Sequence, residues 1–430
     1  MAAKRENGPS KPQQIFLYFA PLTFLVYMVL PHGYFLDIAT SYILKDRLHA
    51  TAVDVSTFHL LTAAPVYLSL FFGLTRDLWN PGGRRDRGYF IIFATVSAAL
   101  FVWMALSRLS YSGLFIGMLL VMFSFRFVAA AYQGLIALIG QEKLMSGRLS
   151  ALWNIVNSVP YIIGACASGW VAENFTPRQI FAWMAIGAIL IALFGFWKPQ
   201  AVFDRAYAQP AAKGWGLVED IKKLMRHRAI YPAVLLMFLF QFSPAQITPF
   251  QFYLTDTLHA SDAVYGYFSA VSAAAFIPMF FLYAFLCKRV RLGKLLWWGI
   301  VIAVPSLAPI LFIHSTQSAL WAAIPIGMMG GIAAAAIYDL AMRSCPPGMQ
   351  GTLMMMVDSA DQLSNRGGDL LGSAIYHASP SNGFLYCVLA TTVVYACMLP
   401  VILLVPKKLL ATADGEAIPD YFTPAPEALP

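Results

Sequence analysis

The sequence predicts an all-α polytopic membrane protein with twelve transmembrane helices in two six-helix bundles. Three observations predict this fold class. Of the 430 residues, 59% are hydrophobic and 12% are charged, whereas a soluble domain has about 25% charged residues. Long apolar runs alternate with short polar gaps, and lysine and arginine gather in every second gap. This pattern excludes a disordered chain and an ordinary soluble enzyme, and it explains the net charge of +8 without a nucleic-acid partner.

Twelve apolar runs are each long enough for a bilayer-spanning helix, which needs about 20 residues. The runs are expected to be helices because open sheet edges do not occur in the hydrocarbon region of a bilayer. The longest gap divides them into six and six. In chain order, the predicted spans are 15–37, 57–75, 89–107, 111–139, 150–171, 178–197, 230–254, 262–286, 295–313, 317–342, 351–376 and 383–405.

The basic residues predict the orientation of these spans. Four of the 29 lysines and arginines fall in one set of gaps and two fall within spans, which leaves 23 in the other gaps and at the ends. Because cytoplasmic loops are rich in Lys and Arg, both termini are expected in the cytoplasm, with the spans in the plasma membrane, here a bacterial inner membrane. The expected segments are a cytoplasmic start (1–14), a first bundle (15–197), a cytoplasmic linker (198–229), a second bundle (230–405) and a cytoplasmic tail (406–430).

The gap between the second and third spans contains the most specific motif. It reads Gly73-Leu-Thr-Arg-Asp77 and continues with Gly82, Arg84 and Arg85. A glycine lets two helices approach closely, and an aspartate accepts hydrogen bonds from a neighbouring helix end. We therefore expect Gly73, Asp77, Arg84 and Arg85 to form a latch that stabilises one of two alternating states.

Leu78 to Pro81 lengthen the spacing between Asp77 and the following glycines. In this lengthened form the motif resembles the signature of the folate-biopterin transporter family, within the major facilitator superfamily. Six plus six spans with a central cytoplasmic linker is also the layout of that superfamily. Muropeptide and siderophore permeases of the same superfamily are close alternatives. Both halves contain further matching segments: Leu25-Val26-Tyr27, Leu44-Lys45-Asp46-Arg47-Leu48, Pro65, and Cys345-Pro346-Pro347-Gly348 followed by Thr352 and Leu353.

The predicted eleventh span departs from that family because it is rich in charged side chains. Asp358, Asp361, Asn365 and Asp369 are spaced by three or four residues, so they share one helical face. A charge in mid-membrane costs on the order of 3 kcal/mol, so this face is expected to line a water-filled cavity between the halves. Asp358 and Asp361 are expected to carry protons, and Asp361, Asn365 and Arg366 are expected to contact substrate.

The first half places one cation, Arg126, well inside the fourth span. Such an arginine requires an anionic partner, either a protein carboxylate or a substrate anion. Asp37 in the first span is the nearest candidate in the same half and is also expected to couple protons. Arg126 is expected to bind the substrate anion, and a fixed structural ion pair between the two helices is the alternative. Tyr34 and Gln133 on the same two spans are expected to line the substrate site.

The second half adds two candidates. Gln241 precedes two prolines in the seventh span and is expected to hydrogen-bond substrate where the helix is broken. Asp339 lies four residues before Arg343 in the tenth span and is a proton-coupling candidate. No two histidines have metal-ligand spacing, so neither a metal nor another cofactor is expected.

These residues predict a secondary transporter that imports a small organic solute with protons. The resemblance implies a pteridine or folate, and another conjugated organic acid or a siderophore chelate is the alternative. A proton-driven exporter of drugs or metabolites and a non-transporting receptor of the same fold stay open. The paired-aspartate pattern of intramembrane proteases fails at Arg366, so an enzyme is not expected. The expected partners are the solute, protons and the lipid bilayer, and the chain is expected to be monomeric.

Overall fold

The regular elements of the protein are helices throughout the part of the chain that the structure describes. The computed structural model describes residues 11–108, 110–203, 222, 225–260, 262–379 and 382–417. Ten helical segments among them are long and apolar enough to cross a membrane. The segment from α12 to η3 and helix α17 bring the number of spans to twelve. The first of these two is broken and the second is charged, which explains why neither meets the length and hydropathy limits.

The first half, described over residues 11–203, opens with two interrupted spans followed by four long helices. Its elements are α1 (Lys11–Val29), α2 (Tyr34–Tyr42), the π-helical turn η1 (Ile43–Arg47), α3 (Ala52–Thr62), α4 (Ala64–Tyr67), α5 (Ser69–Leu78), η2 (Pro81–Gly83), α6 (Asp86–Leu106), α7 (Tyr111–Glu142), α8 (Ser146–Asn174) and α9 (Pro177–Phe194).

The second half, described over residues 225–417 apart from 261, 380 and 381, opens with one interrupted span, from α12 to η3, which is followed by five further spans. Its elements are α12 (Ile230–Gln241), α13 (Thr248–Phe252), the π-helical turn η3 (Tyr253–Thr257), α14 (Asp262–Leu286), α15 (Leu292–Ala303), η4 (Ala308–Phe312), α16 (Thr316–Ser344), α17 (Gln350–Ala378), α18 (Gly383–Ala396), α19 (Met398–Ile402) and α20 (Lys407–Leu410).

The predicted span boundaries agree with these helices to within several residues, with two corrections. The predicted first span, 15–37, is broken at 30–33, where Pro31 and Gly33 interrupt the helix, and its last turn extends to Arg47. The predicted seventh span, 230–254, is broken between Gln241 and Thr248 because Pro244 cannot continue the hydrogen-bond ladder. Most of the predicted linker and the end of the predicted tail lie outside the described residues.

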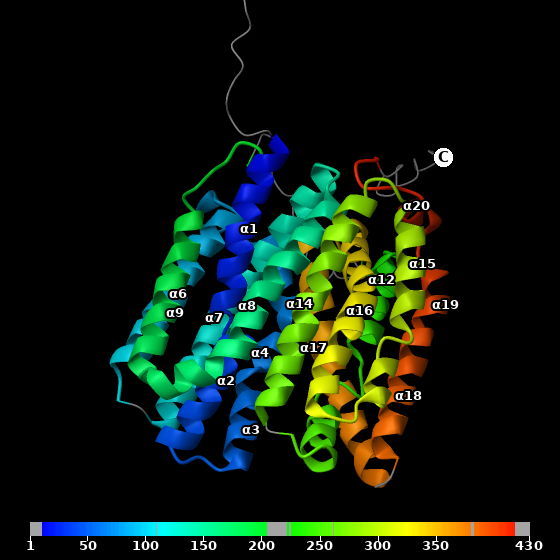
Figure 1. Ribbon diagram of the computed structural model, residues 1–430. Helices are drawn as coiled ribbons and strands as arrows, with labels where there is room; N and C mark the ends of the chain where they lie inside the picture. Colours follow the sequence, from blue (N-terminus) through cyan, green and yellow to red (C-terminus); the bar gives the residue numbers. More distant parts are fainter. Residues whose placement is uncertain are drawn as a thin grey trace, which may run out of the picture.

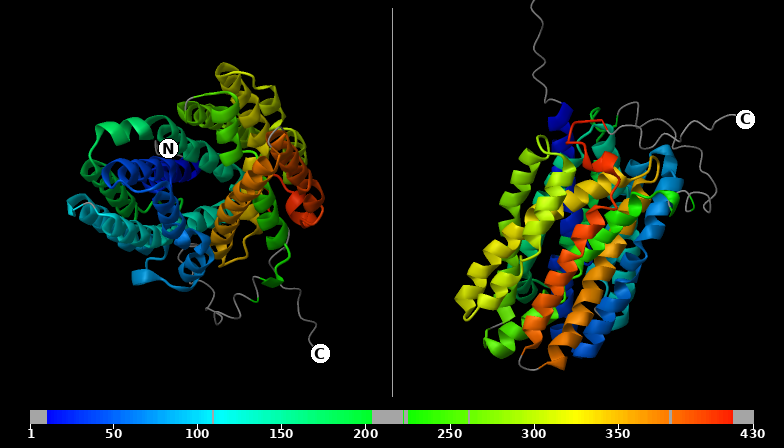
Figure 2. Two further views of the ribbon diagram at one scale, coloured as in Figure 1. Left: turned by 90° about the horizontal axis from the view of Figure 1, so that it is seen from below. Right: turned by 90° about the vertical axis from the view of Figure 1, so that its right-hand side faces the viewer.

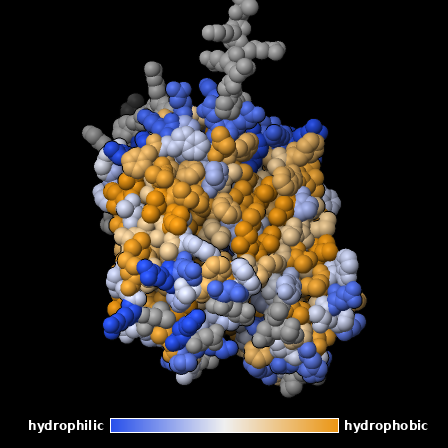
Figure 3. All heavy atoms as spheres, turned by 60° about the vertical axis from the view of Figure 1, so that its left-hand side comes forward, coloured by the Kyte–Doolittle hydropathy of each residue, from blue (hydrophilic) through white to orange (hydrophobic). Residues whose placement is uncertain are grey.

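Both ends of the described chain lie on one side of the bundle. The first turn of α1 and helix α20 are at the top of Figure 1, and we call this end the termini side and the opposite end the far side. Seen along the bundle, the helices of the first half and those of the second half form two groups (Figure 2, left). Hydrophobic residues form a broad band between the hydrophilic ends of the face in Figure 3, as a bilayer requires.

The first spans of the two halves end with the same sequence and the same backbone. Residues 44–50 and 254–260 both read Leu-X-Asp-X-Leu-His-Ala. Each segment closes a π-helical turn, and the histidine of each has a positive φ, 52° at His49 and 50° at His259. The two halves are therefore structural repeats, which is typical of transporter folds.

The halves contact each other mainly through three helices of each half. Helix α5 packs on α17, and α8 packs on α14 and α16. Helix α7 also contacts α17, so it lies between the two groups. These helices therefore supply side chains to any site that the halves share.

Candidate functional site

A buried ion pair connects the halves near the middle of α7. The Arg126 side chain is 2% exposed, and its two terminal nitrogens lie 2.7 and 3.0 Å from Asp358 Oδ2 on α17. Ser69 of α5 is 3.3 Å from the same guanidinium. The sequence proposed Asp37 as the partner of Arg126, and this is wrong. Helix α17 packs against α7, so the carboxylate comes from the other half of the chain.

Two polar atoms, one in this pair and one on the next turn of α17, are buried without a hydrogen-bond partner among the described residues. They are Nε of Arg126 and Oδ1 of Asp361, one helical turn after Asp358. Buried polar groups are almost always hydrogen-bonded in proteins. The two orphaned atoms therefore mark a place where water or a bound polar molecule completes the hydrogen bonding.

Asp37 is engaged by a histidine of the same half. Its Oδ1 lies 2.9 Å from His59 Nδ1, and His59 Nε2 lies 2.8 Å from the Ser41 hydroxyl. Asp37 and Ser41 belong to α2, and His59 belongs to α3. The three side chains form a chain of hydrogen bonds with two titratable groups, a structural basis for holding or passing a proton.

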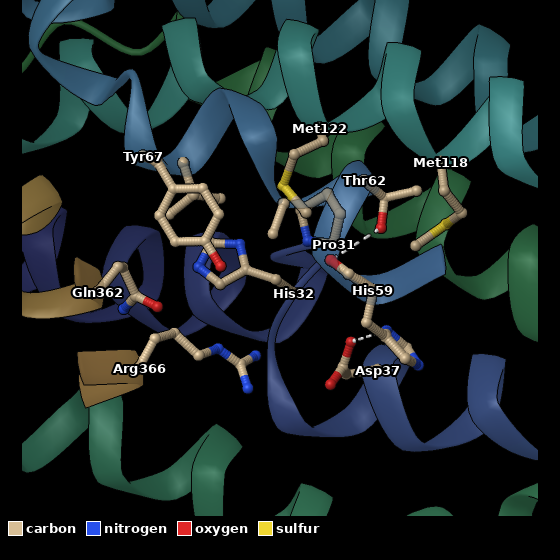
Figure 4. A pocket seen from close by; sticks show the side chains of 12 residues that line it. Pro31, His32, Asp37, His59, Thr62, Tyr67, Met118, Met122, Gln362 and Arg366 are labelled. Carbon is tan, nitrogen blue, oxygen red and sulfur yellow. Dashed lines mark hydrogen bonds and ion pairs between the residues drawn. The ribbon is translucent and has the colours of Figure 1, made fainter. Parts of the chain in front are cut away.

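A cavity of about 60 Å³ lies between the Asp37–His59 pair and α17. Organic ligands occupy cavities of roughly 300–1,000 Å³, so in this conformation the space is too small for such a solute. Figure 4 shows Gln362 and Arg366 facing His32 across the cavity from the Asp37–His59 pair. Its lining is Pro31, His32, Asp37, His59, Thr62, Ala63, Val66, Tyr67, Met118, Met122, Gln362 and Arg366.

The polar face of α17 is divided between three surroundings, which corrects the prediction of one cavity-lining stripe. Asp358 pairs with Arg126 of the first half. Asp361 accepts a hydrogen bond from Gln362 at 3.0 Å and lies beside Gln241. Both carboxylate oxygens of Asp369 bind Thr248 at the start of α13.

The remaining predicted residues of α17 have less defined surroundings. Asn365 is half-buried, and the exposed Arg366 reaches the cavity. Gln241 lies where predicted, at the break of the seventh span, and contacts Asp361. The side chain of Tyr34 lies outside the described residues.

An aromatic cluster closes the space between the halves close to Gln133. The Tyr338 hydroxyl donates to Gln133 Oε1 at 3.1 Å, while Gln133 and Trp153 donate to the Tyr27 hydroxyl. The rings of Trp153 on α8 and Tyr338 on α16 stack at 4.0 Å with an interplanar angle of 8°. Trp153 was not predictable as a site residue, because a tryptophan inside an apolar run has no distinguishing signal in the sequence.

Asp339 does not reach the cavity, so its predicted role in proton coupling has no geometric support. Its side chain is fully buried, and its oxygens lie 2.8 and 3.0 Å from Arg343 and 2.8 Å from the Tyr283 hydroxyl. Because carboxylate and guanidinium are paired and hydrogen-bonded, this group forms a structural ion pair within the second half.

The predicted latch lies on the termini side, where α5 meets α17. Asp77 accepts hydrogen bonds from the backbone N–H groups of Gly351 and Thr352 at 3.1 and 2.6 Å. A Cβ at Gly73 would lie 2.5 Å from the Gly351 carbonyl oxygen, so this contact requires glycine. The Asp77 carboxylate therefore binds the first turn of α17, where the helix dipole favours a negative charge.

The guanidinium of the latch comes from Arg76 rather than from Arg84 or Arg85. Arg76 lies 2.7 Å from Asp77 Oδ1 and 2.5 Å from Asp86 Oδ1. Arg84 is exposed and Arg85 is half-buried. Arg84 and Arg85 follow the 3-10 turn Pro81–Gly83, whereas Arg76 lies on α5 directly before Asp77.

Replacing Asp77 with asparagine is expected to weaken the termini-side contact. The change removes the charge that binds two N–H groups and Arg76, and hydrogen bonds to a charged group contribute about 1.5–3 kcal/mol. The side chain is 4% exposed, so water does not replace these bonds. Reactivity of the buried Cys345 with a maleimide should rise about tenfold or more. Unchanged reactivity in a correctly folded variant would contradict a latch.

Comparison with known proteins gives one family, a related sequence and two similar solved structures. The model of the Major Facilitator Superfamily matches residues 15–365. A folate-biopterin transporter from Synechocystis sp. is 25% identical over 356 residues, which cover 79% of this chain and 71% of the relative. The solved structure of the proton:xylose symporter XylE has a TM-score of 0.68 at 13% identity, covering 95% of this chain and 98% of that one. The human organic anion transporter MFSD10 (TETRAN) has a TM-score of 0.61 at 14% identity, covering 92% and 100%. These two structures share the fold.

Proposed function

The chain belongs to the major facilitator superfamily, and from this we propose that it imports a small organic anion together with protons by alternating access. The proposed solute is a pteridine or folate, the chemistry named for the Synechocystis relative. Another conjugated organic acid or a siderophore chelate has the same requirements of charge and shape.

The Arg126–Asp358 pair is the observation that carries this proposal. It connects a helix of the first half to a helix of the second half in a buried place. A guanidinium binds a carboxylate through two parallel hydrogen bonds, so an incoming anion can take the place of Asp358 on Arg126. The orphaned Nε of Arg126 is a donor that such an anion would satisfy.

Proton coupling follows from what happens to Asp358 once it is displaced. It would then lie one turn from Asp361, which has no cationic partner among its described contacts. Two neighbouring carboxylates without a cation disfavour double ionisation, so one of them takes up a proton. The solute anion and the proton therefore enter the site together. The Asp37–His59 pair would supply that proton from the far side.

The aromatic cluster supports a solute with a planar ring. Trp153 and Tyr338 belong to different halves and lie face to face. When the halves separate, these two faces would become available to a flat conjugated ring, since offset stacking is a favoured arrangement of aromatic rings. Gln133 and Tyr27 beside them offer donors and acceptors for ring nitrogens.

The charge pattern supports an orientation. We infer that the termini side faces the cytoplasm of a bacterial inner membrane, because the basic residues of the loops gather there. In this proposal the predicted bundles 15–197 and 230–405 move against each other, and the protein works as a monomer.

Purified protein in liposomes that contain a pH-sensitive dye tests this function. Under an inward proton gradient, addition of folate or a pterin should acidify the lumen, and muropeptides, ferric siderophores and cationic drugs serve as comparison solutes. Replacing Asp358 with asparagine should abolish the solute-dependent acidification, because the displaced residue could no longer take up a proton.

The matched control is Asp256→Asn, an exposed aspartate at the end of the seventh span. This variant should acidify the lumen at the wild-type rate. Solute accumulation without proton movement would contradict the coupling. Acidification only with cationic drugs would contradict an anionic solute.

A further inference from the structure

Helices α8 and α17 begin with the same local structure in the two halves. Each follows a residue with a positive φ, Leu144 at 51° and Gly348 at 81°. The next residue, Met145 or Met349, is the N-cap, with φ and ψ of −125° and 19° or −123° and 26°. A glycine, Gly147 or Gly351, occupies the second position of each helix. The two helix starts are therefore equivalent positions of the repeat.

At α17 the exposed N–H groups of this start are bound by Asp77 from the end of α5. The equivalent neighbour of α8 is Cys287, which follows the last residue of α14. A Cβ at Gly147 would lie 2.9 Å from the Cys287 Cβ, just as one at Gly351 would lie 2.8 Å from Asp77 Oδ1. The second half thus has a thiol where the first half has its latch carboxylate.

The missing carboxylate comes from the segment that follows α20. Asp414 Oδ1 accepts the Gly147 N–H at 2.9 Å, and its Oδ2 lies 2.5 Å from Arg148 Nε. The Asp414 side chain is 1% exposed. Its backbone N–H donates to the Cys287 carbonyl at 2.8 Å. Asp414 therefore lies directly beside Cys287, the position equivalent to Asp77.

The same segment is fixed to the second half. The Thr412 carbonyl accepts from Arg343 at 3.1 Å and from the Leu292 N–H at 3.2 Å. Asp339 orients Arg343 through their buried ion pair, and Arg343 in turn binds Thr412. Residues 412–414 consequently move with the second half, while the Asp414 carboxylate binds the first.

We propose that Asp414 is the second termini-side latch and supplies from the tail the carboxylate that the loop between α14 and α15 lacks. The closed termini side is then held by two carboxylates at two equivalent helix starts, Asp77 at α17 and Asp414 at α8. Both must release before this side opens. The inference uses the alternating access of the proposed function but not its solute or its protons.

The test measures opening of the termini side by the reactivity of a single thiol. Cys345 is fully buried at the junction of the halves, where its carbonyl accepts from Gln141, and burial raises the pKa of its thiol well above the usual range. In a protein with Cys166, Cys287, Cys387 and Cys397 replaced by serine, Cys345 should therefore react slowly with a maleimide. Asp414→Asn should accelerate this reaction about tenfold, as expected for losing hydrogen bonds to a charge in one of two states.

The matched control is Glu416→Gln, which changes an exposed acid two residues away whose described contact is the local N–H of Ala413. It should leave the rate of Cys345 labelling unchanged. Asp77→Asn serves as the reference for the contact at the start of α17. An Asp414→Asn rate equal to that of Glu416→Gln, with Asp77→Asn accelerated, would overturn the proposal.

A gain-of-function variant guards against a folding defect. Cys287→Asp places a carboxylate at the position equivalent to Asp77. Combined with Asp414→Asn, it should return Cys345 labelling toward the slow rate. If the combined variant labels as fast as Asp414→Asn alone, the assignment is wrong. None of these rates depends on a solute, so they stand apart from the outcome of the proton-flux experiment.

Discussion

Replacing Arg126 with glutamine is expected to abolish solute-dependent proton uptake and to lower the free energy of unfolding by about 3–5 kcal/mol, the usual cost of removing one member of a buried ion pair. Asp358 would lose its counter-ion in a largely buried place, and the donor proposed to bind the solute would be lost. Thermal unfolding in detergent and dye-loaded liposomes measure the two effects separately.

The double variant Arg126→Gln, Asp358→Asn separates binding from structure. Both charges are removed, so the unpaired carboxylate disappears and most of the stability should return. Transport should stay absent if Arg126 binds the solute anion. Recovery of transport in the stable double variant would assign the pair a purely structural role and refute the proposed mechanism.

Replacing Gly73 with valine is expected to hold the termini side open. The new Cβ would lie within 2.8 Å of backbone atoms of Gly351 and Thr352, which have no freedom to rotate away. Helices α5 and α17 must then separate, and Asp77 loses its bonds to the start of α17. A loss of about 3 kcal/mol from the closed state corresponds to roughly a hundredfold shift. Cys345 labelling should rise accordingly, and transport should fall to background.

Phe71→Leu is the control for this substitution, because Phe71 lies on the same helix with 60% of its side chain exposed. Its labelling and transport should match those of the wild-type protein. A Gly73→Val protein that folds, transports and keeps Cys345 protected would show that the close approach of α5 and α17 is dispensable.

The fold was predictable because it depends on quantities that a sequence states directly. Run length, the spacing of lysines and arginines and the long gap after the sixth span all follow from how a bilayer treats apolar and charged groups. The latch was also found in outline, since Gly73 and Asp77 form a compact motif. Family membership adds the layout of the halves.

The partners of the charged residues were not predictable in the same way. Arg126 could be recognised as needing an anion, but its partner depends on how α17 is rotated against α7, and hydropathy contains no such information. Asp37 belongs to the same half of the chain as Arg126 yet pairs with His59 instead. The same limit applies to Asp369, which binds the start of α13 because the seventh span is broken there.

Asp414 shows a different reason for a missed residue. It lies in a tail after the last span, where composition suggests no packing, and its role becomes visible only when α8 and α17 are compared as repeats. The sequence does contain a signal for that comparison. The segments at 44–50 and 254–260 share five of seven positions. Aligning the halves on these segments pairs Asp77 with Cys287, so the second half lacks a carboxylate at that position.

The charge content of α17 has a consequence for how the protein is made. Asp358, Asp361, Arg366 and Asp369 each oppose transfer from the translocon into lipid by about 2.5–3.5 kcal/mol near the helix centre. The helix therefore depends on neighbours that are already in the membrane. Arg126 in turn has no Asp358 to pair with until the chain is 232 residues longer. Biogenesis of the second half is thus a templated step, in which the first half provides the polar surface that lets α17 leave the translocon.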